Sequence, residues 1–159
     1  MERVKRIFEH DTFQLCMKKI SAAEKNRIYC LHDMTHCLDV ARIAYIMCLE
    51  QGLDYQKDVI YAMALLHDIG RSEEYSSGRS HHEAGEKLAR QILLDTGFSP
   101  KEQELICDAI CRHKVEDADR TSLAYLLYKA DKCSRRCYEC RAADSCYWSE
   151  EQKNNTIYI

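Results

Sequence analysis

DYQKDVIYAMALLHDIG, residues 54–70, is an apolar helical pattern that ends in a histidine and an aspartate. The apolar positions that share a helical face with His67 are Ile60, Met63 and Ala64. They share it because residues three and four apart lie on the same side of a helix with 3.6 residues per turn. Asp54 can cap the start of this helix, and Gly70 can end it. The pattern predicts a buried helix over residues 54–67 that carries a polar pair into the core.

Three more helical patterns place a metal-type ligand on an apolar face. The ligands are His36, His113 and Asp131, and their faces contain Val40, Ile43, Ala44 and Met47; Ile106, Ala109 and Ile110; and Ala124, Leu127 and Tyr128, respectively. An apolar face packs inward, so we expect these ligands to meet His67 in one interior cavity. Neutral imidazole and carboxylate form a ligand set for first-row transition metals. One buried histidine alone is typical of core packing, whereas several together predict a metal site.

The composition favours an all-α protein. The 159 residues include one proline and five glycines, and good helix formers are plentiful. We expect a single-domain helical bundle of about six or seven helices, with the metal site in its core and one domain over residues 1–159. The expected helices cover residues 4–20, 35–51, 54–67, 81–96, 100–113 and 122–131. Residues 71–80 and 114–120 are expected to be loops, and no stretch alternates as a strand does.

Charge and hydropathy exclude several partners. With 23 basic and 26 acidic residues the net charge is −3, and no basic patch predicts a nucleic-acid partner. No apolar run approaches the ~20 residues of a membrane span, and MERVKRIFEH lacks the apolar region of a secretory signal. We therefore expect a cytoplasmic protein without a membrane partner. The sequence leaves a homodimer open.

The ordered ligand set resembles the HD-domain superfamily of metal-dependent phosphohydrolases. The residues that carry the resemblance are His36, His67-Asp68-Ile69-Gly70, His81, His113 and Asp131, within a motif region of about residues 30–135. The resemblance implies a core metal site formed by His36, His67, Asp68 and Asp131. It also implies that His81 and His113 permit a second metal, with Asp68 as the bridge. The cofactor is then one or two divalent transition-metal ions: iron, manganese, nickel, cobalt or zinc.

The neighbours of these ligands complete the expected mechanism. A metal lowers the pKa of bound water to around neutrality, and the resulting hydroxide attacks phosphorus. Arg71 directly follows the His-Asp-Ile-Gly turn, and Lys132 follows a presumed ligand, so both are expected to neutralise charge on the phosphoryl oxygens. The catalytic candidates are thus Asp68, Arg71 and Lys132. His81 has a more apolar helical face than His82 and is the preferred ligand, but the sequence does not settle this choice.

The expected activity is hydrolysis of a phosphoester or phosphoanhydride in a small phosphorylated substrate. That this substrate is a nucleotide is implied by the resemblance alone, because no nucleoside-specific motif occurs. One alternative is a regulatory module that binds metal or nucleotide without turnover. Another is a redox or metal sensor built on the cysteines.

The chain contains ten cysteines, and the missing secretory signal favours reduced thiols. Four of them, Cys16, Cys30, Cys37 and Cys48, are expected to be small buried apolar residues. Another four, Cys133, Cys137, Cys140 and Cys146, lie in a cysteine-rich C-terminal extension over residues 133–150. They could bind zinc or an iron–sulfur cluster, or remain thiols that pack against Tyr138, Tyr147 and Trp148. If the helix over residues 122–131 continues, Cys133 and Cys137 share one of its faces.

Overall fold

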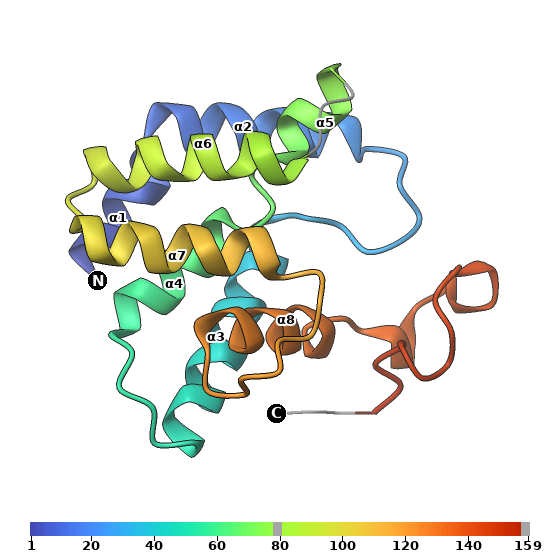
Figure 1. Cartoon of the computed structure of the whole chain (residues 1–159). Coiled ribbons are helices and arrows are strands. Elements are labelled where there is room, and N and C mark those ends of the chain that lie inside the picture. Colours follow the sequence, from blue (N-terminus) through green and yellow to red (C-terminus); the bar gives the residue numbers. More distant parts are fainter. Residues whose placement is uncertain (78–80, 157–159) are drawn as a thin grey trace.

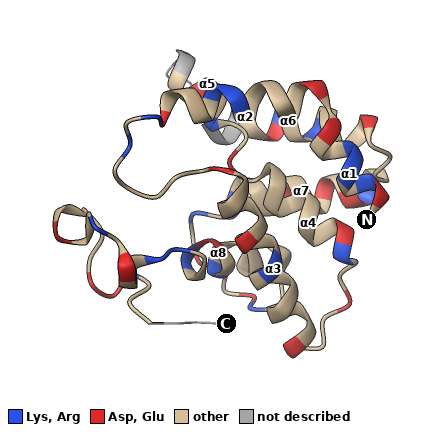
Figure 2. Ribbon diagram, turned by 180° about the vertical axis from the view of Figure 1, so that it is seen from behind, with Lys and Arg blue, Asp and Glu red and all other residues tan. Residues whose placement is uncertain are grey.

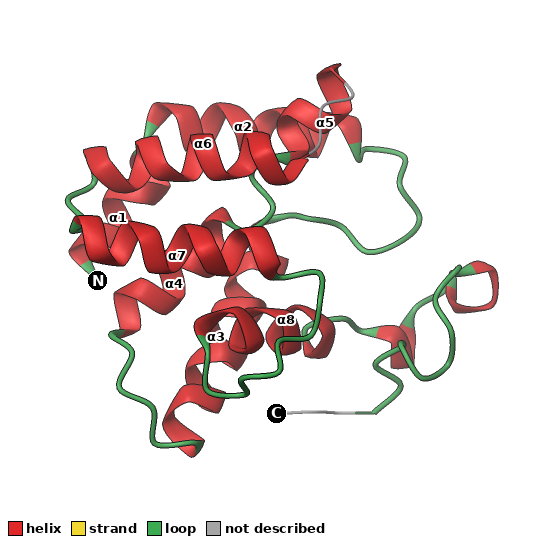
Figure 3. Ribbon diagram, in the orientation of Figure 1, coloured by secondary structure: helices red, strands yellow, loops and turns green. Residues whose placement is uncertain are grey.

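The computed structural model is all-helical, which confirms the predicted fold class (Figures 1 and 3). It describes the backbone of residues 1–77 and 81–156, and the side chains of residues 1–75 and 84–156. In these residues there are eight α-helices and no strand: α1 Glu2–Glu9, α2 Asp11–Ala23, α3 Met34–Glu50, α4 Lys57–Leu66, α5 Arg71–Ser77, α6 His81–Asp95, α7 Pro100–Arg112 and α8 Leu123–Cys133. Two 3₁₀ turns follow, η1 Cys137–Glu139 and η2 Ala143–Ser145. None of the described helices has both the length and the apolar character needed to cross a bilayer.

Helix α4 is the centre of the bundle, because it contacts α1, α3, α6, α7 and α8. Seven of its ten residues are buried, from Val59 and Ile60 through Ala62 to Leu66. A helix that is apolar around most of its circumference cannot lie on a surface and becomes a core helix. The core therefore delivers the residues that follow α4, His67 and Asp68, to the interior of the protein.

Capping residues fix the starts of the helices that carry the predicted ligands. The Asp33 carboxylate accepts a hydrogen bond from the backbone nitrogen of His36 at 2.9 Å, at the first turn of α3. Ser99 and Glu102 form a capping box at α7, and Ser122 accepts from the Tyr125 backbone at α8. Each cap satisfies backbone donors that a helix start leaves unpaired.

The cap predicted for α4 is wrong. The helix begins at Lys57 rather than at Asp54, and its N-cap residue, Gln56, makes no capping hydrogen bond from its side chain. The preceding residues serve a different purpose, because Leu53 and Tyr55 pack against the core. Burial of those two side chains holds the connection extended before the helix starts.

Two other segments differ from the predicted helices. Residues 4–20 form two helices, because His10 adopts an extended conformation and its ring accepts from the Thr12 backbone as the cap of α2. Within the predicted loop 71–80, residues Arg71–Ser77 form helix α5, and residues 78–80 lie outside the described part. Tertiary packing explains α5, because it contacts both α2 and α6. The polar residues of this segment form no apolar face that would indicate those contacts.

Helix α8 continues past Asp131 but ends at Cys133, so it does not extend far enough for Cys133 and Cys137 to share one of its faces. The side-chain amide of Asn154 donates to the carbonyl oxygens of Cys133 and Arg135, both at 2.8 Å, and so satisfies acceptors at the helix end. From there the chain forms an extension without an α-helix, which lies beside the bundle (Figure 1, orange to red).

Candidate metal centre

Four of the predicted ligands meet at one point in the interior. His36 comes from the first turn of α3, His67 and Asp68 follow α4, and Asp131 comes from α8. The Nε2 atom of His36 lies 3.3 Å from Nε2 of His67, 3.4 Å from an oxygen of Asp131 and 3.9 Å from an oxygen of Asp68. The same Asp68 oxygen lies 3.1 Å from Nε2 of His67. Two imidazoles and two carboxylates thus converge from three helices.

Hydrogen bonds to the backbone turn the imidazoles so that Nε2 faces the cluster. The Nδ1 atom of His67 lies 2.7 Å from the carbonyl oxygen of Ala64. A carbonyl oxygen only accepts, so Nδ1 carries the proton and donates. His113 makes the same bond to Ile110 at 2.5 Å, and its ring centre lies 5.6 Å from that of His67. Bonds of this kind orient metal-binding histidines.

His36 is oriented by Ser134, a residue that the sequence analysis missed. The Ser134 hydroxyl donates to the carbonyl oxygen of Asp131 at 2.8 Å, and its oxygen lies 3.2 Å from Nδ1 of His36. Because the hydroxyl proton is used on Asp131, the Ser134 oxygen accepts from the imidazole. The position i+3 from Asp131 near the end of a helix is the signal that could have identified this residue.

Burial and the neighbouring charges set the protonation of the cluster. Burial, and secondarily His67, lower the pKa of His36 to about 4, and the same two causes lower that of His113 to about 4. Both imidazoles are therefore neutral at neutral pH, as metal ligands must be. Burial alone would raise the pKa of Asp68, but the neighbouring His67 and Arg71 hold it well below its usual range. The carboxylate is ionised and can accept a cation.

The donor set fits a divalent metal ion. Among the described residues, His36, His67 and Asp68 form one group whose ligand atoms all lie within 4.8 Å of one another. Imidazole nitrogen and carboxylate oxygen suit zinc, iron, manganese, cobalt and nickel, so the set does not choose among them. The cluster can thus hold a metal, and Asp131 and His113 lie beside it.

The three remaining histidines of interest have different outcomes. The predicted ligand His81 and its alternative His82 have side chains outside the described residues. His32, which precedes α3, lies buried against the cluster, with Nε2 3.8 Å from an Asp68 oxygen and Nδ1 2.5 Å from Glu24. The spacing of four residues between His32 and His36 is the feature of the sequence that indicates a position near the cluster.

Basic residues surround the carboxylates, and two of them were predicted. Arg71 donates from Nε to Asp68 at 2.7 Å, and the Lys132 ammonium lies 3.6 Å from an Asp131 oxygen. Arg135, one turn after Asp131, donates to the same carboxylate at 2.9 Å and was missed. Figure 2 shows basic positions following α8 into the extension. Spacing i, i+4 from Asp131 could have revealed Arg135.

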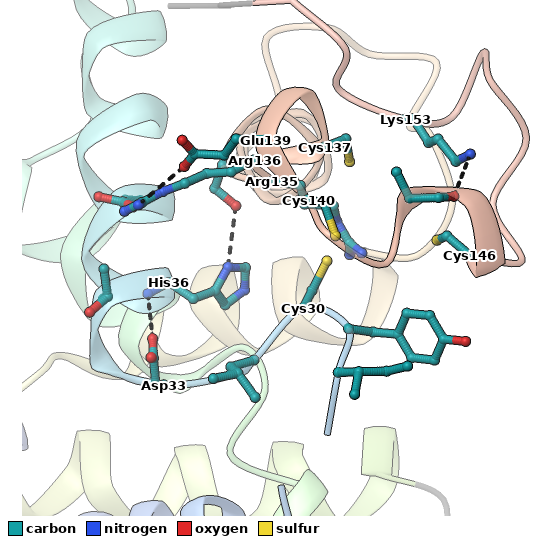
Figure 4. Close-up of a pocket in the computed structure, with 17 residues that line it drawn as sticks. Cys30, Asp33, His36, Arg135, Arg136, Cys137, Glu139, Cys140, Cys146 and Lys153 are labelled. Carbon is teal, nitrogen blue, oxygen red and sulfur yellow. Dashed lines mark hydrogen bonds and ion pairs between the residues drawn. The ribbon is translucent and has the colours of Figure 1, made fainter. Parts of the chain in front are cut away.

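A pocket of about 410 Å³ opens beside the cluster (Figure 4). His36 and Ser134 lie on its wall, together with Arg135 from the start of the extension and residues of the loop before α3. This volume falls within the range of small-molecule sites. The pocket therefore links the candidate metal centre with the surface.

The hydrogen bond from Ser134 predicts a measurable effect on metal affinity. Ser134→Ala removes the acceptor of His36 while leaving the imidazole in place, so we expect metal to bind about 10- to 100-fold more weakly. Titration of metal-free protein with manganese measures this change. Ser149→Ala, at an exposed serine of the extension, is the matched control and should bind as the wild type does. Equal affinities for all three proteins would show that Ser134 does not orient His36.

The fold and this cluster define an all-helical domain with a histidine–aspartate metal centre in its core. The chain belongs to the HD-domain family, since residues 33–136 match that family. It is 37% identical over 158 residues to an uncharacterized protein of Clostridium beijerinckii, with 99% of both chains covered. Family membership and the ligand cluster together support a metal-dependent hydrolase of the HD type.

Other similarities cover the chain unequally. It is 38% identical over 101 residues to ribonuclease Y of Thermus thermophilus, and 31% over 101 residues to ribonuclease Y of Lactobacillus gasseri. These matches span 64% of this chain but only 16% and 17% of the two ribonucleases. The crystal structure of a predicted HD superfamily hydrolase from an uncultured Thermotogales bacterium shares the fold, with a TM-score of 0.64, 22% identity, and 91% and 80% of the two chains covered.

Proposed function

We propose that the protein is a metal-dependent phosphohydrolase that acts on a small phosphorylated substrate. The observation that carries the proposal is the convergence of His36, His67, Asp68 and Asp131 at 3.1–3.9 Å in the interior. We assign these four residues as ligands of a core metal. We assign His113 and His81 as the ligands that permit a second metal.

A divalent metal held there would supply Lewis acidity and a nucleophilic hydroxide at neutral pH. The residues of the chain do the rest. One oxygen of Asp68 faces His67 and the other faces Arg71, so the carboxylate can bind the metal with one oxygen and hold the arginine with the other. Ser134 keeps His36 turned toward the cluster. His67, Asp68 and Asp131 are themselves buried, and the low dielectric around buried groups strengthens their electrostatic interactions.

Arginine side chains give the site its preference for phosphate. The Nε atom of Arg135 is buried and has no hydrogen-bond partner among the described residues, although the guanidinium is fixed by Asp131 and lies 4.1 Å from the centre of the Trp148 ring. A buried donor without a partner is costly unless a ligand satisfies it. Arg135 also lines the pocket beside His36, so a phosphoryl oxygen entering there would meet this donor. Arg71 and Lys132 would neutralise further charge from the other sides.

A nucleotide is the substrate class that we favour. The pocket that Arg135 lines also carries apolar and aromatic side chains, Ile28, Tyr29 and Leu31, against which a base could pack. The ribonuclease Y similarity points to phosphodiester chemistry, because that enzyme, by its name, cleaves RNA. Short RNA therefore joins nucleoside monophosphates, dinucleoside polyphosphates and cyclic nucleotides as test substrates.

A screen of metals against substrates tests the proposal. Metal-free protein is reconstituted separately with manganese, iron, cobalt, nickel and zinc, and phosphate or nucleotide release is measured for each substrate class. We expect hydrolysis with at least one metal and its loss when a chelator is added. Tight binding of metal and nucleotide without turnover in any combination would contradict the proposal and favour a regulatory module.

A further inference from the structure

Four cysteines from two distant parts of the chain line the pocket beside His36. We call Cys30, Cys137, Cys140 and Cys146 the cysteine set. Cys30 lies in the loop before α3, and the other three lie in the C-terminal extension. Figure 4 shows the thiols of Cys30 and Cys140 facing each other across the pocket. Two predictions change accordingly: Cys30 is half-buried rather than core, and Cys133 does not line this pocket.

The extension has no hydrophobic core of its own. From Ser134 to Thr156 not one side chain is buried, and the regular structure after α8 consists of the two 3₁₀ turns alone within the described residues. Burial of apolar surface is the main term that offsets the entropy cost of ordering a chain. Short segments that bury little apolar surface are commonly ordered by disulfides or by a metal. All ten cysteines are free in the structure, and four of them line one pocket, so a metal is the candidate that we consider.

We propose that the cysteine set binds one zinc ion in a structural site with four thiolate ligands. Four thiolates are a known structural zinc set, and the C-x₂-C spacing of Cys137 and Cys140 lets both sulfurs reach one ion. Soft thiolate ligands also discriminate against manganese, which prefers oxygen donors. The site is therefore chemically distinct from the histidine–aspartate cluster.

Hydrogen bonds hold the two segments together. The Tyr29 hydroxyl donates to the carbonyl oxygen of Ser145 at 3.1 Å, which joins the Cys30 loop to the residue before Cys146. Arg27 donates to the Cys30 carbonyl at 2.8 Å and fixes that loop. Burial raises the pKa of the Cys30 thiol, whereas Arg135 opposes the rise and favours the thiolate.

The sulfurs must still close around the ion. Among the described residues, the histidine–aspartate group is the one whose ligand atoms all lie within 4.8 Å, so the cysteine set is more open than a ligated site. Closure requires the extension to move toward Cys30. Because none of its side chains is buried, that movement breaks no core packing.

Zinc at this position would stabilise the orientation of His36. Cys30 precedes the α3 cap Asp33 by three residues, and Ser134 precedes Cys137 by three. Asp33 bonds the His36 backbone, and Ser134 bonds its ring. The ion would thus join the two segments that fix one ligand of the candidate metal centre from opposite sides.

Zinc content of purified variants tests the proposal. We expect Asp68→Asn, whose core cluster is disabled, to keep about one zinc ion per chain, and Cys140→Ser to hold about one zinc ion fewer than the wild type. Cys111→Ser is the matched control, because Cys111 is exposed on α7 and outside the cysteine set. Cobalt added to metal-free wild type should give the strong visible absorption of tetrahedral thiolate coordination. Zinc that is lost in Asp68→Asn and retained in Cys140→Ser would overturn the proposal.

Alkylation of the wild-type protein gives a second test that no folding defect can confuse. Iodoacetamide with mass spectrometry should label Cys111 at a rate that the chelator does not change, whereas the cysteine set should react at least about tenfold faster after zinc is removed by a chelator. Equal labelling before and after chelation would overturn the proposal. Iron with acid-labile sulfide, or a disulfide between Cys30 and Cys140, would also overturn it. Hydrolysis enters neither test, so this inference can fail while the proposed function stands.

Discussion

Replacing Asp68 with asparagine is expected to reduce hydrolysis by at least ~10³-fold, equivalent to about 4 kcal/mol of transition-state stabilisation. The carboxylate lies 3.1 Å from His67 Nε2 and 2.7 Å from Arg71 Nε, so it joins the ligand cluster to the arginine that we propose as a phosphate contact. An amide of the same size keeps the packing but removes the charge that binds a divalent ion. Steady-state kinetics on the substrate identified by the screen measures the loss.

The control for this experiment is Asp108→Asn on α7. Asp108 is exposed and pairs with Arg112 at the surface, so its substitution should leave kcat and KM unchanged. Circular dichroism of both variants checks that the bundle is intact. If Asp68→Asn is folded and retains more than about a tenth of wild-type activity, the histidine–aspartate cluster is not the catalytic centre.

Phe13→Ala is expected to lower the free energy of unfolding by about 3–5 kcal/mol. Phe13 is fully buried on α2 and belongs to the main core cluster, so truncation leaves a cavity that the bundle refills only in part. The corresponding loss in the melting temperature is on the order of 10 °C for a domain of this size. Urea denaturation followed by circular dichroism gives the free energy directly.

Leu15→Ala on the same helix is the matched control. Leu15 is 55% exposed, so its truncation should cost less than about 1 kcal/mol. This pair tests the helix phase, because both residues lie in α2 and only one faces the core. Similar losses for the two variants would contradict the packing of α2 described above.

The apolar faces of long helices predicted much of this fold from the sequence. His36, His67 and Asp131 close such faces, and burial of those faces carries the three side chains to one place. The apolar content of α4 identified the core helix in the same way. Where a helix depends on contacts rather than on its own pattern, the prediction was wrong. Helix α5 is polar, and its contacts with α2 and α6 are visible only in three dimensions.

The supporting residues of the site were harder to predict. Ser134 and Arg135 act through Asp131 and His36. Their spacing of three and four residues from Asp131 was the one signal in the sequence, and many surface residues near a helix end share such a spacing. Cys30 lies more than 100 residues from the cysteines that it faces, so spacing along the chain could not group them. These residues can be grouped only when the three-dimensional positions of the loop before α3 and of the extension are known.

Metal content in wild type and Asp68→Asn tests the central claim most directly. Both proteins are stripped of metal, incubated with manganese, desalted and subjected to elemental analysis, because manganese prefers the nitrogen and oxygen ligands of the cluster to thiolates. We predict that the wild type retains about one or two manganese ions per chain and that Asp68→Asn retains none. Equal retention by the two folded proteins would contradict a metal centre at His36, His67, Asp68 and Asp131.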